Sequence, residues 1–105
     1  TVLGFAPMTQ FRSNSPLAES LALKHFTEQL TGKSIRFYIG NRDMMVGTAK
    51  CFDFVEKLAN QAYHQRIRPP QVEMFIVPSI GFKGHATAPE TFFDGARWLK
   101  KMLLK

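Results

Sequence analysis

Three short apolar runs alternate along this chain with segments in which apolar residues recur every three or four positions. The runs cover residues 2–6, 35–39 and 72–77, with Pro7 after the first and Gly40 after the second. They are rich in β-branched and aromatic side chains, and runs that are apolar at successive positions are typical of strands buried on both faces of a parallel sheet. The pattern therefore predicts three strands.

The segments between these runs have the pattern of amphipathic helices. The first is predicted to begin at Pro16, with Ser15 as its N-cap, and to stop at Gly32. The second is predicted to begin with Thr48 as its N-cap and to reach about Arg66, before a pair of prolines. Each helix then connects one predicted strand to the next.

A third helix is predicted after a loop that runs from Pro78 to Pro89. Spacings of three and four define the apolar stripes of the last two helices. The stripe of the second helix comprises Phe52, Val55, Leu58, Ala59 and Ala62, and that of the third comprises Phe92, Phe93, Ala96, Leu99, Met102 and Leu103.

The order strand, helix, strand, helix, strand, helix is typical of right-handed crossovers and a parallel sheet. We expect an α/β fold in three layers, with the 105 residues forming a single segment. Three strands are few for such a sheet, because doubly wound sheets usually have five or more. Since Thr1 also opens directly into a predicted buried strand, we expect the chain to be a piece of a larger domain.

Composition and charge exclude several classes of protein. With 45% hydrophobic and 21% charged residues, the chain has the composition of a packed globular protein. The net charge of +6 is spread evenly, with six basic and three acidic residues in 1–52 and eight and five in 53–105. Because no dense basic stretch or known aromatic RNA-binding signature accompanies the charge, we predict no nucleic-acid partner.

The cysteine and histidine content predicts neither a disulfide nor a metal site. Cys51 is the single cysteine, and His25, His64 and His85 are far apart in the sequence. We expect no cofactor, and a reducing compartment such as the cytoplasm. The sequence has no apolar stretch of about 18 residues and no leader pattern, so we expect a soluble chain without a membrane partner.

Two polar residues follow predicted strands, where open parallel sheets gather their catalytic groups. Asp43 lies in the loop after the second strand, and His85 lies between glycine and small residues after the third. Asp43 taken alone is a common type of turn residue, and a loop histidine taken alone is commonly just solvated. Loops after adjacent parallel strands lie side by side, however, so the two side chains are predicted to meet. A carboxylate that orients an imidazole is the supporting half of a Ser-His-Asp triad.

These motifs resemble the C-terminal part of an α/β-hydrolase. Gly40-x-x-Asp43-x-x-Val46 is similar to the acid loop of that family, and Gly84-His85 before a closing helix is similar to its histidine loop. The two residues are 42 positions apart, which leaves room for one helix and one strand. Phe5-Ala6-Pro7-Met8-Thr9 resembles the strand after the nucleophile strand in bacterial esterase-like and prolyl-oligopeptidase-like members. The resemblance spans essentially the whole chain and implies a partial α/β-hydrolase fold.

The resemblance implies ester hydrolysis, or peptide and amide hydrolysis, with Asp43 as the orienting acid and His85 as the general base. The nucleophile motif of the family, Gly-x-Ser-x-Gly, does not occur in the sequence. Ser79 lacks the glycine that the motif requires two residues before the serine, and it lies in the loop that also carries His85. We therefore do not assign it as the nucleophile. We expect the chain to be inactive alone and to pair with a missing N-terminal segment, or with itself, through its first strand.

Two other functions remain open at the level of sequence. The chain could be a complete small α/β binding module whose loops hold an anion or a protein, with Arg42, Lys83 and His85 as contacts. A nucleic-acid binder would depend on the +6 charge alone and would show an affinity that falls steeply with salt.

Overall fold

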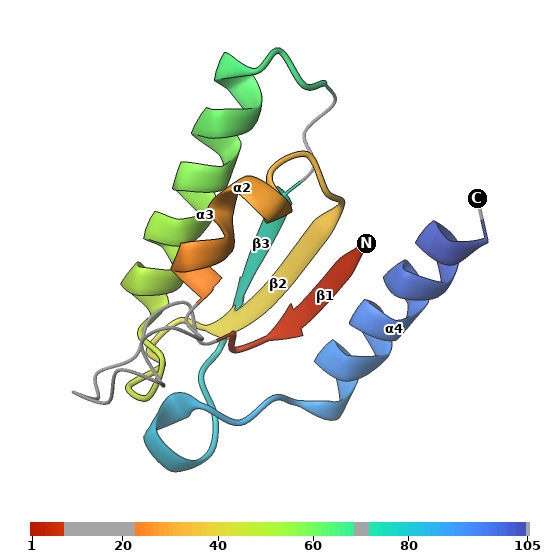
Figure 1. Ribbon diagram of the computed structural model, residues 1–105. Coiled ribbons are helices and arrows are strands. Elements are labelled where there is room, and N and C mark those ends of the chain that lie inside the picture. Colours follow the sequence, from red (N-terminus) through yellow and green to blue (C-terminus); the bar gives the residue numbers. More distant parts are fainter. Residues whose placement is uncertain (8–22, 69–71, 105) are drawn as a thin grey trace.

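The computed structural model describes residues 1–7, 23–68 and 72–104, and its centre is a parallel sheet of three strands. These are β1 (Val2–Phe5), β2 (Ile35–Gly40) and β3 (Val72–Val77), in the spatial order β1-β2-β3 (Figure 1). The prediction of three parallel strands is confirmed. Because all three run in the same direction, their carboxyl ends meet at one edge of the sheet.

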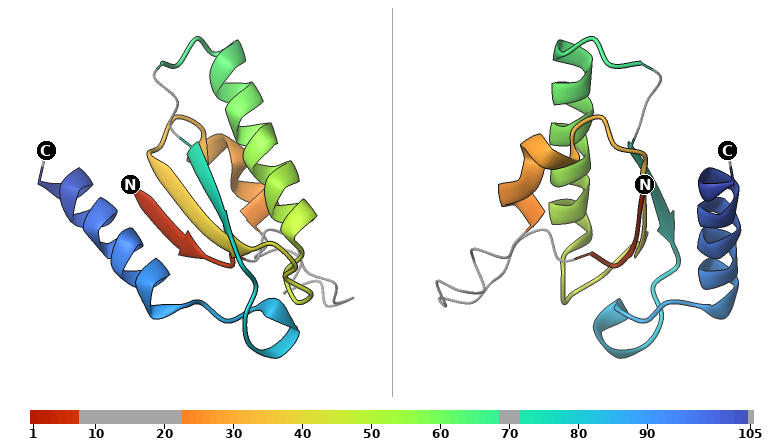
Figure 2. Two further views of the ribbon diagram at one scale, coloured as in Figure 1. Left: turned by 180° about the vertical axis from the view of Figure 1, so that it is seen from behind. Right: turned by 45° about the vertical axis from the view of Figure 1, so that its right-hand side comes forward.

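Helices lie on both faces of this sheet, as Figure 2 shows. One face carries a 3₁₀ turn, η1 (Leu23–Phe26), the short helix α2 (Thr27–Leu30) and the long helix α3 (Thr48–His64). The other face carries α4 (Pro89–Leu103), which contacts β1 and β2. The described residues therefore form an α/β fold with the sheet between two helical layers.

The side chains of β2 alternate between these two layers. Ile35, Phe37 and Ile39 are each 1% exposed and pack, with the α3 residues Phe54 and Leu58, into the hydrophobic core. The alternate side chains of the strand therefore point to the α4 face. The sheet is thus covered on one side by an apolar core and on the other by a more polar interface.

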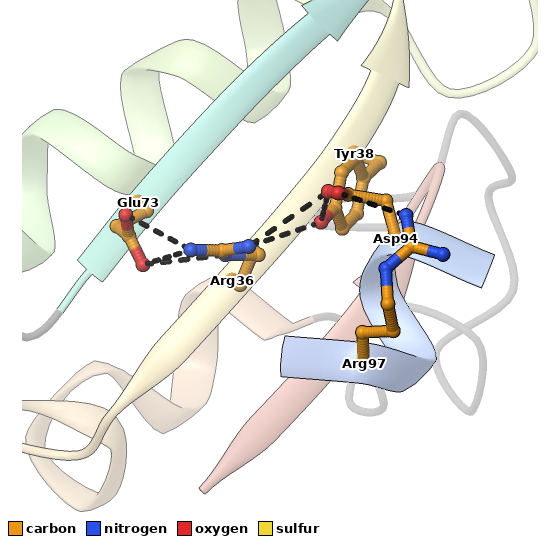
Figure 3. Close-up of polar contacts among 5 residues, drawn as sticks. All are labelled: Arg36, Tyr38, Glu73, Asp94 and Arg97. Atoms are coloured by element: carbon orange, nitrogen blue, oxygen red, sulfur yellow. Dashed lines mark hydrogen bonds and ion pairs between the residues drawn. The ribbon is translucent and has the colours of Figure 1, made fainter. Parts of the chain in front are cut away.

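A polar network joins β2 and β3 to α4 on that second face (Figure 3). Arg36 pairs with Glu73 across the strands at 3.1 Å and also donates a hydrogen bond to the Tyr38 hydroxyl. The Tyr38 hydroxyl in turn donates to Asp94 of α4, and Arg97 lies 3.6 Å from the same carboxylate. Nothing in the hydrophobic pattern of the sequence points to this network, since it joins β2, β3 and α4, which are far apart in the chain.

The predicted apolar stripe of the second helix is partly wrong. Phe52 is 49% exposed, and Ala59 is also exposed, whereas Cys51 and Phe54 are buried together with Leu58 and Ala62. Positions 51, 54, 58 and 62 also follow spacings of three and four, so the periodicity fits two neighbouring stripes. The docking angle of α3 on the sheet, a tertiary property, selects between them.

Several predicted boundaries also change. Gly47, not Thr48, is the N-cap of α3, and β1 ends at Phe5 before Ala6 adopts a positive φ of 47°. The predicted start of the first helix at Pro16, with its cap at Ser15, lies outside the described residues. Within the described part of the chain, no helix is long and apolar enough to cross a membrane.

Candidate functional site

The two residues singled out after the strands form a contact at the carboxyl edge of the sheet. Asp43 follows the end of β2, and His85 follows the end of β3. The Oδ2 atom of Asp43 lies 2.9 Å from Nδ1 of His85. The Asp43 side chain is fully buried, whereas the side chain of His85 is 35% exposed. The pair thus combines a carboxylate that is shielded from solvent with an imidazole that is accessible to solvent.

The carboxylate of Asp43 is held by the loop that carries it. Its Oδ1 atom accepts hydrogen bonds from the backbone N–H groups of Met45 at 2.9 Å and Val46 at 2.8 Å. The backbone N–H of Asp43 donates to Oγ1 of Thr48, and this hydroxyl donates to the carbonyl of Gly40. Thr48 therefore closes the loop onto the end of β2, whereas its position in the sequence predicts a helix cap.

This arrangement keeps Asp43 ionised. Burial alone raises the pKa of the carboxyl, but the hydrogen bonds from Val46, His85 and Met45 and the charge of His85 outweigh it, so the pKa lies below its usual value of 3.8. An ionised carboxylate can only accept a hydrogen bond, so the Nδ1–H group of His85 donates to it. The neutral imidazole then carries its lone pair on Nε2, which is the form that a general base requires.

The loop of His85 is pressed against the loop of Asp43. A short 3₁₀ turn, η2 (Phe82–Gly84), leads into the histidine, and the backbone N–H of Met44 donates to the carbonyl of Lys83 at 2.8 Å. A Cβ atom on Gly84 would lie 2.2 Å from the carbonyl oxygen of Arg42. The close approach of the two loops therefore requires glycine at this position.

Ser79 connects the same two loops. Its hydroxyl accepts a hydrogen bond from the backbone N–H of Arg42 at 2.7 Å, and its own N–H donates to Oδ1 of Asn41 at 3.1 Å. The hydroxyl is thus engaged with the backbone of the acid loop, which is a structural role. The sequence around Ser79 does not predict a nucleophile, and no local pattern in it indicates this bridge.

Cys51 is also unsuited to act as a nucleophile. It is buried in α3, and burial together with the negative charge of Asp43 raises the pKa of its thiol to about 11. The thiol is therefore protonated at neutral pH, whereas reactive cysteines are thiolates. Among the described residues, no group of three or more histidine, cysteine, aspartate or glutamate side chains could hold a metal ion.

Comparisons of the chain with models of protein families, with curated proteins and with solved structures found no match. The catalytic roles of Asp43 and His85 therefore stay predictions, supported by the geometry of the pair and by the resemblance of the sequence motifs.

Proposed function

We propose that this chain is the C-terminal part of a serine hydrolase with an α/β-hydrolase fold, acting on esters or, as the second choice, on amides and peptides. The observation that carries the proposal is the 2.9 Å contact between the buried Asp43 carboxylate and the accessible His85 imidazole. The order of the two residues, on the loops after two successive parallel strands, also agrees with that family. Asp43 is the orienting acid and His85 is the general base.

The nucleophile in this proposal is a serine from a segment outside these 105 residues. His85 Nε2 takes the hydroxyl proton as the serine oxygen attacks the ester carbonyl, and Asp43 stabilises the resulting imidazolium. The imidazolium then gives this proton to the leaving alcohol, and the acyl group remains on the serine. A water molecule, deprotonated by the same imidazole, releases the acid and restores the serine.

The segment that supplies the nucleophile is also the proposed partner of β1. This strand pairs with β2 on one side only among the described strands, so its other edge offers free backbone groups. The proposal places the protein in the cytoplasm, where a free cysteine such as Cys51 stays reduced.

The test is hydrolysis of 4-nitrophenyl butyrate by the longer protein that joins these residues to the nucleophile segment. We expect His85→Ala and Asp43→Asn each to lower kcat by about 10³-fold or more, because each removes a member of the triad. His64→Ala is the matched control, since His64 is an exposed histidine at the end of α3. Near-normal turnover by His85→Ala would show that the assignment is wrong.

A labelling experiment tests the missing nucleophile separately. A fluorophosphonate that reacts with activated serines is expected to modify the longer protein at a serine outside this chain. It is expected to leave the 105-residue chain unlabelled, because the hydroxyl of Ser79 is bonded to the acid loop. Modification of Ser79 itself would contradict the proposal.

A further inference from the structure

A hollow of about 440 Å³ lies beside the Asp43–His85 pair, between the same two loops. Its lining includes the residues on either side of Asp43, namely Arg42 and Met44, and the residue before His85, Gly84. The loops that position the pair therefore also form the wall of this hollow. None of the roles assigned above uses this hollow.

Two cations line this hollow, one from each loop. Arg42 and Lys83 are both exposed, and among the described residues neither forms an ion pair with a carboxylate. The ammonium of Lys83 lies 5.4 Å from the centre of the Phe82 ring, a distance at which a cation interacts with an aromatic face. The hydroxyl of Ser79 is a further polar group of the lining.

Lys83 has an unusual backbone conformation. Its φ is 54°, in the left-handed region that favours glycine or asparagine over a long side chain. The position nevertheless carries lysine, between Phe82 and Gly84 and two residues before His85. The side chain that lines the hollow therefore comes from the middle residue of η2.

We propose that this hollow binds a carboxylate of the substrate, with Arg42 and Lys83 as its cationic contacts. The proposal rests on the proposed function and narrows the substrate to esters of dicarboxylic acids, such as hemisuccinates. Ile80 and Met44, which are 43% and 47% exposed, add apolar surface for the short carbon chain between the carboxylate and the ester.

The first test measures binding without catalysis. Titration of the ¹⁵N-labelled protein with succinate is expected to shift the backbone amide signals of Arg42, Lys83 and Gly84, and succinamide is expected not to shift them. The double variant Arg42→Gln/Lys83→Gln should weaken succinate binding by about tenfold or more, as expected for the loss of charge-assisted hydrogen bonds. Equal responses to succinate and succinamide, or shifts confined to other parts of the chain, would overturn the proposal.

The second test uses turnover by the longer protein. The ratio of kcat/KM for 4-nitrophenyl hemisuccinate to that for 4-nitrophenyl butyrate is expected to fall about tenfold in the double variant. The control Lys57→Gln/Lys101→Gln removes the same charge from exposed positions on α3 and α4 and should keep the ratio within about twofold. An unchanged ratio in Arg42→Gln/Lys83→Gln would overturn the substrate assignment.

The two tests also separate this inference from the proposed function. If the longer protein hydrolyses neither ester, the proposed function fails, and the succinate titration still decides whether the hollow is an anion site. If it hydrolyses butyrate through His85 but shows neither succinate binding nor a preference for the hemisuccinate, the function stands and the inference is wrong.

Discussion

The Asp43 carboxylate accepts three hydrogen bonds at a position without solvent exposure. Hydrogen bonds to a buried charge contribute about 1.5–3 kcal/mol each to stability, more than those between neutral groups. An asparagine at this position would present an N–H to the loop or to His85, where an acceptor is needed. The carboxylate therefore stabilises the loop and orients the imidazole at the same time.

We predict that Asp43→Asn lowers the free energy of unfolding by about 1–3 kcal/mol at neutral pH. Because folding lowers the pKa of Asp43, its contribution is present above the ordinary value of 3.8 and is lost as the pH falls through the lower pKa of the folded state. Urea denaturation of both proteins from neutral pH to well below 3.8 measures the difference. A difference that stays constant over this range would contradict the role given to the charge.

Gly84 provides a second prediction at the scale of the residue. A Cβ atom there would collide with the backbone carbonyl of Arg42, and φ is +70°, so Gly84→Ala forces the two loops apart. Gly47→Ala is the control, because φ is +83° there but the nearest atoms belong to the flexible side chain of Lys50. We expect thermal denaturation to show a larger loss of stability for Gly84→Ala, by about 1–3 kcal/mol. Equal losses would mean that the loops are not in close contact.

At the scale of the element, β2 organises the molecule because its two faces carry different chemistry. Its Ile35, Phe37 and Ile39 side chains bury against the α3 layer, and its Arg36 and Tyr38 side chains join the network that reaches α4. Burial and the hydrogen bond to Asp94 raise the pKa of Tyr38 above 10, so its hydroxyl remains a donor at neutral pH. The polar network thereby holds α4, the element that directly follows the His85 loop.

A double-mutant cycle tests this anchor of α4. Tyr38→Phe and Asp94→Ala each remove one partner of the same hydrogen bond, so we expect their effects on unfolding free energy to be non-additive by about 1 kcal/mol. Arg97→Ala is the control, because this exposed ion pair with Asp94 is expected to contribute well below 1 kcal/mol. Additive effects in guanidinium denaturation would show that the hydrogen bond does not anchor the helix.

At the scale of the whole molecule, the sheet leaves the backbone of β1 unpaired on one side among the described strands. The N–H group of Val2 donates to the carbonyl of Ser34, just before β2, and the N–H group of Ala6 donates to the carbonyl of Tyr38, within β2. Since the direction of these groups alternates along a strand, the N–H groups of Leu3 and Phe5 point to the free edge. Such an edge is a template for another strand.

We therefore predict that the 105-residue chain self-associates through β1 as its concentration rises. Leu3→Pro removes an N–H from the free edge and is expected to reduce the associated fraction in sedimentation velocity experiments, with circular dichroism to check the fold. Phe93→Ser is the matched control, because Phe93 is 65% exposed on α4 and offers an alternative apolar contact. A chain that stays monomeric at all concentrations, or one that responds only to Phe93→Ser, would contradict this prediction.

The sequence by itself determined the class of fold, the order of the elements and the two loops that carry Asp43 and His85. These features depend on local signals: apolar runs, spacings of three and four, and glycine or proline at the ends of elements. The contact between the two side chains was predicted from the order of the elements, because successive parallel strands are usually neighbours and bring their carboxyl ends to one edge of the sheet.

Only the tertiary structure decided which stripe of α3 is buried, because spacings of three and four fit both Cys51 and Phe52 as starting points. It also decided the role of Thr48, whose hydroxyl closes the acid loop rather than capping the helix. The bridge made by Ser79 and the network from Arg36 to Asp94 were likewise invisible in the sequence. Each of these depends on how elements distant in the chain pack together. The periodicity of one element does not determine the angle at which another element packs against it.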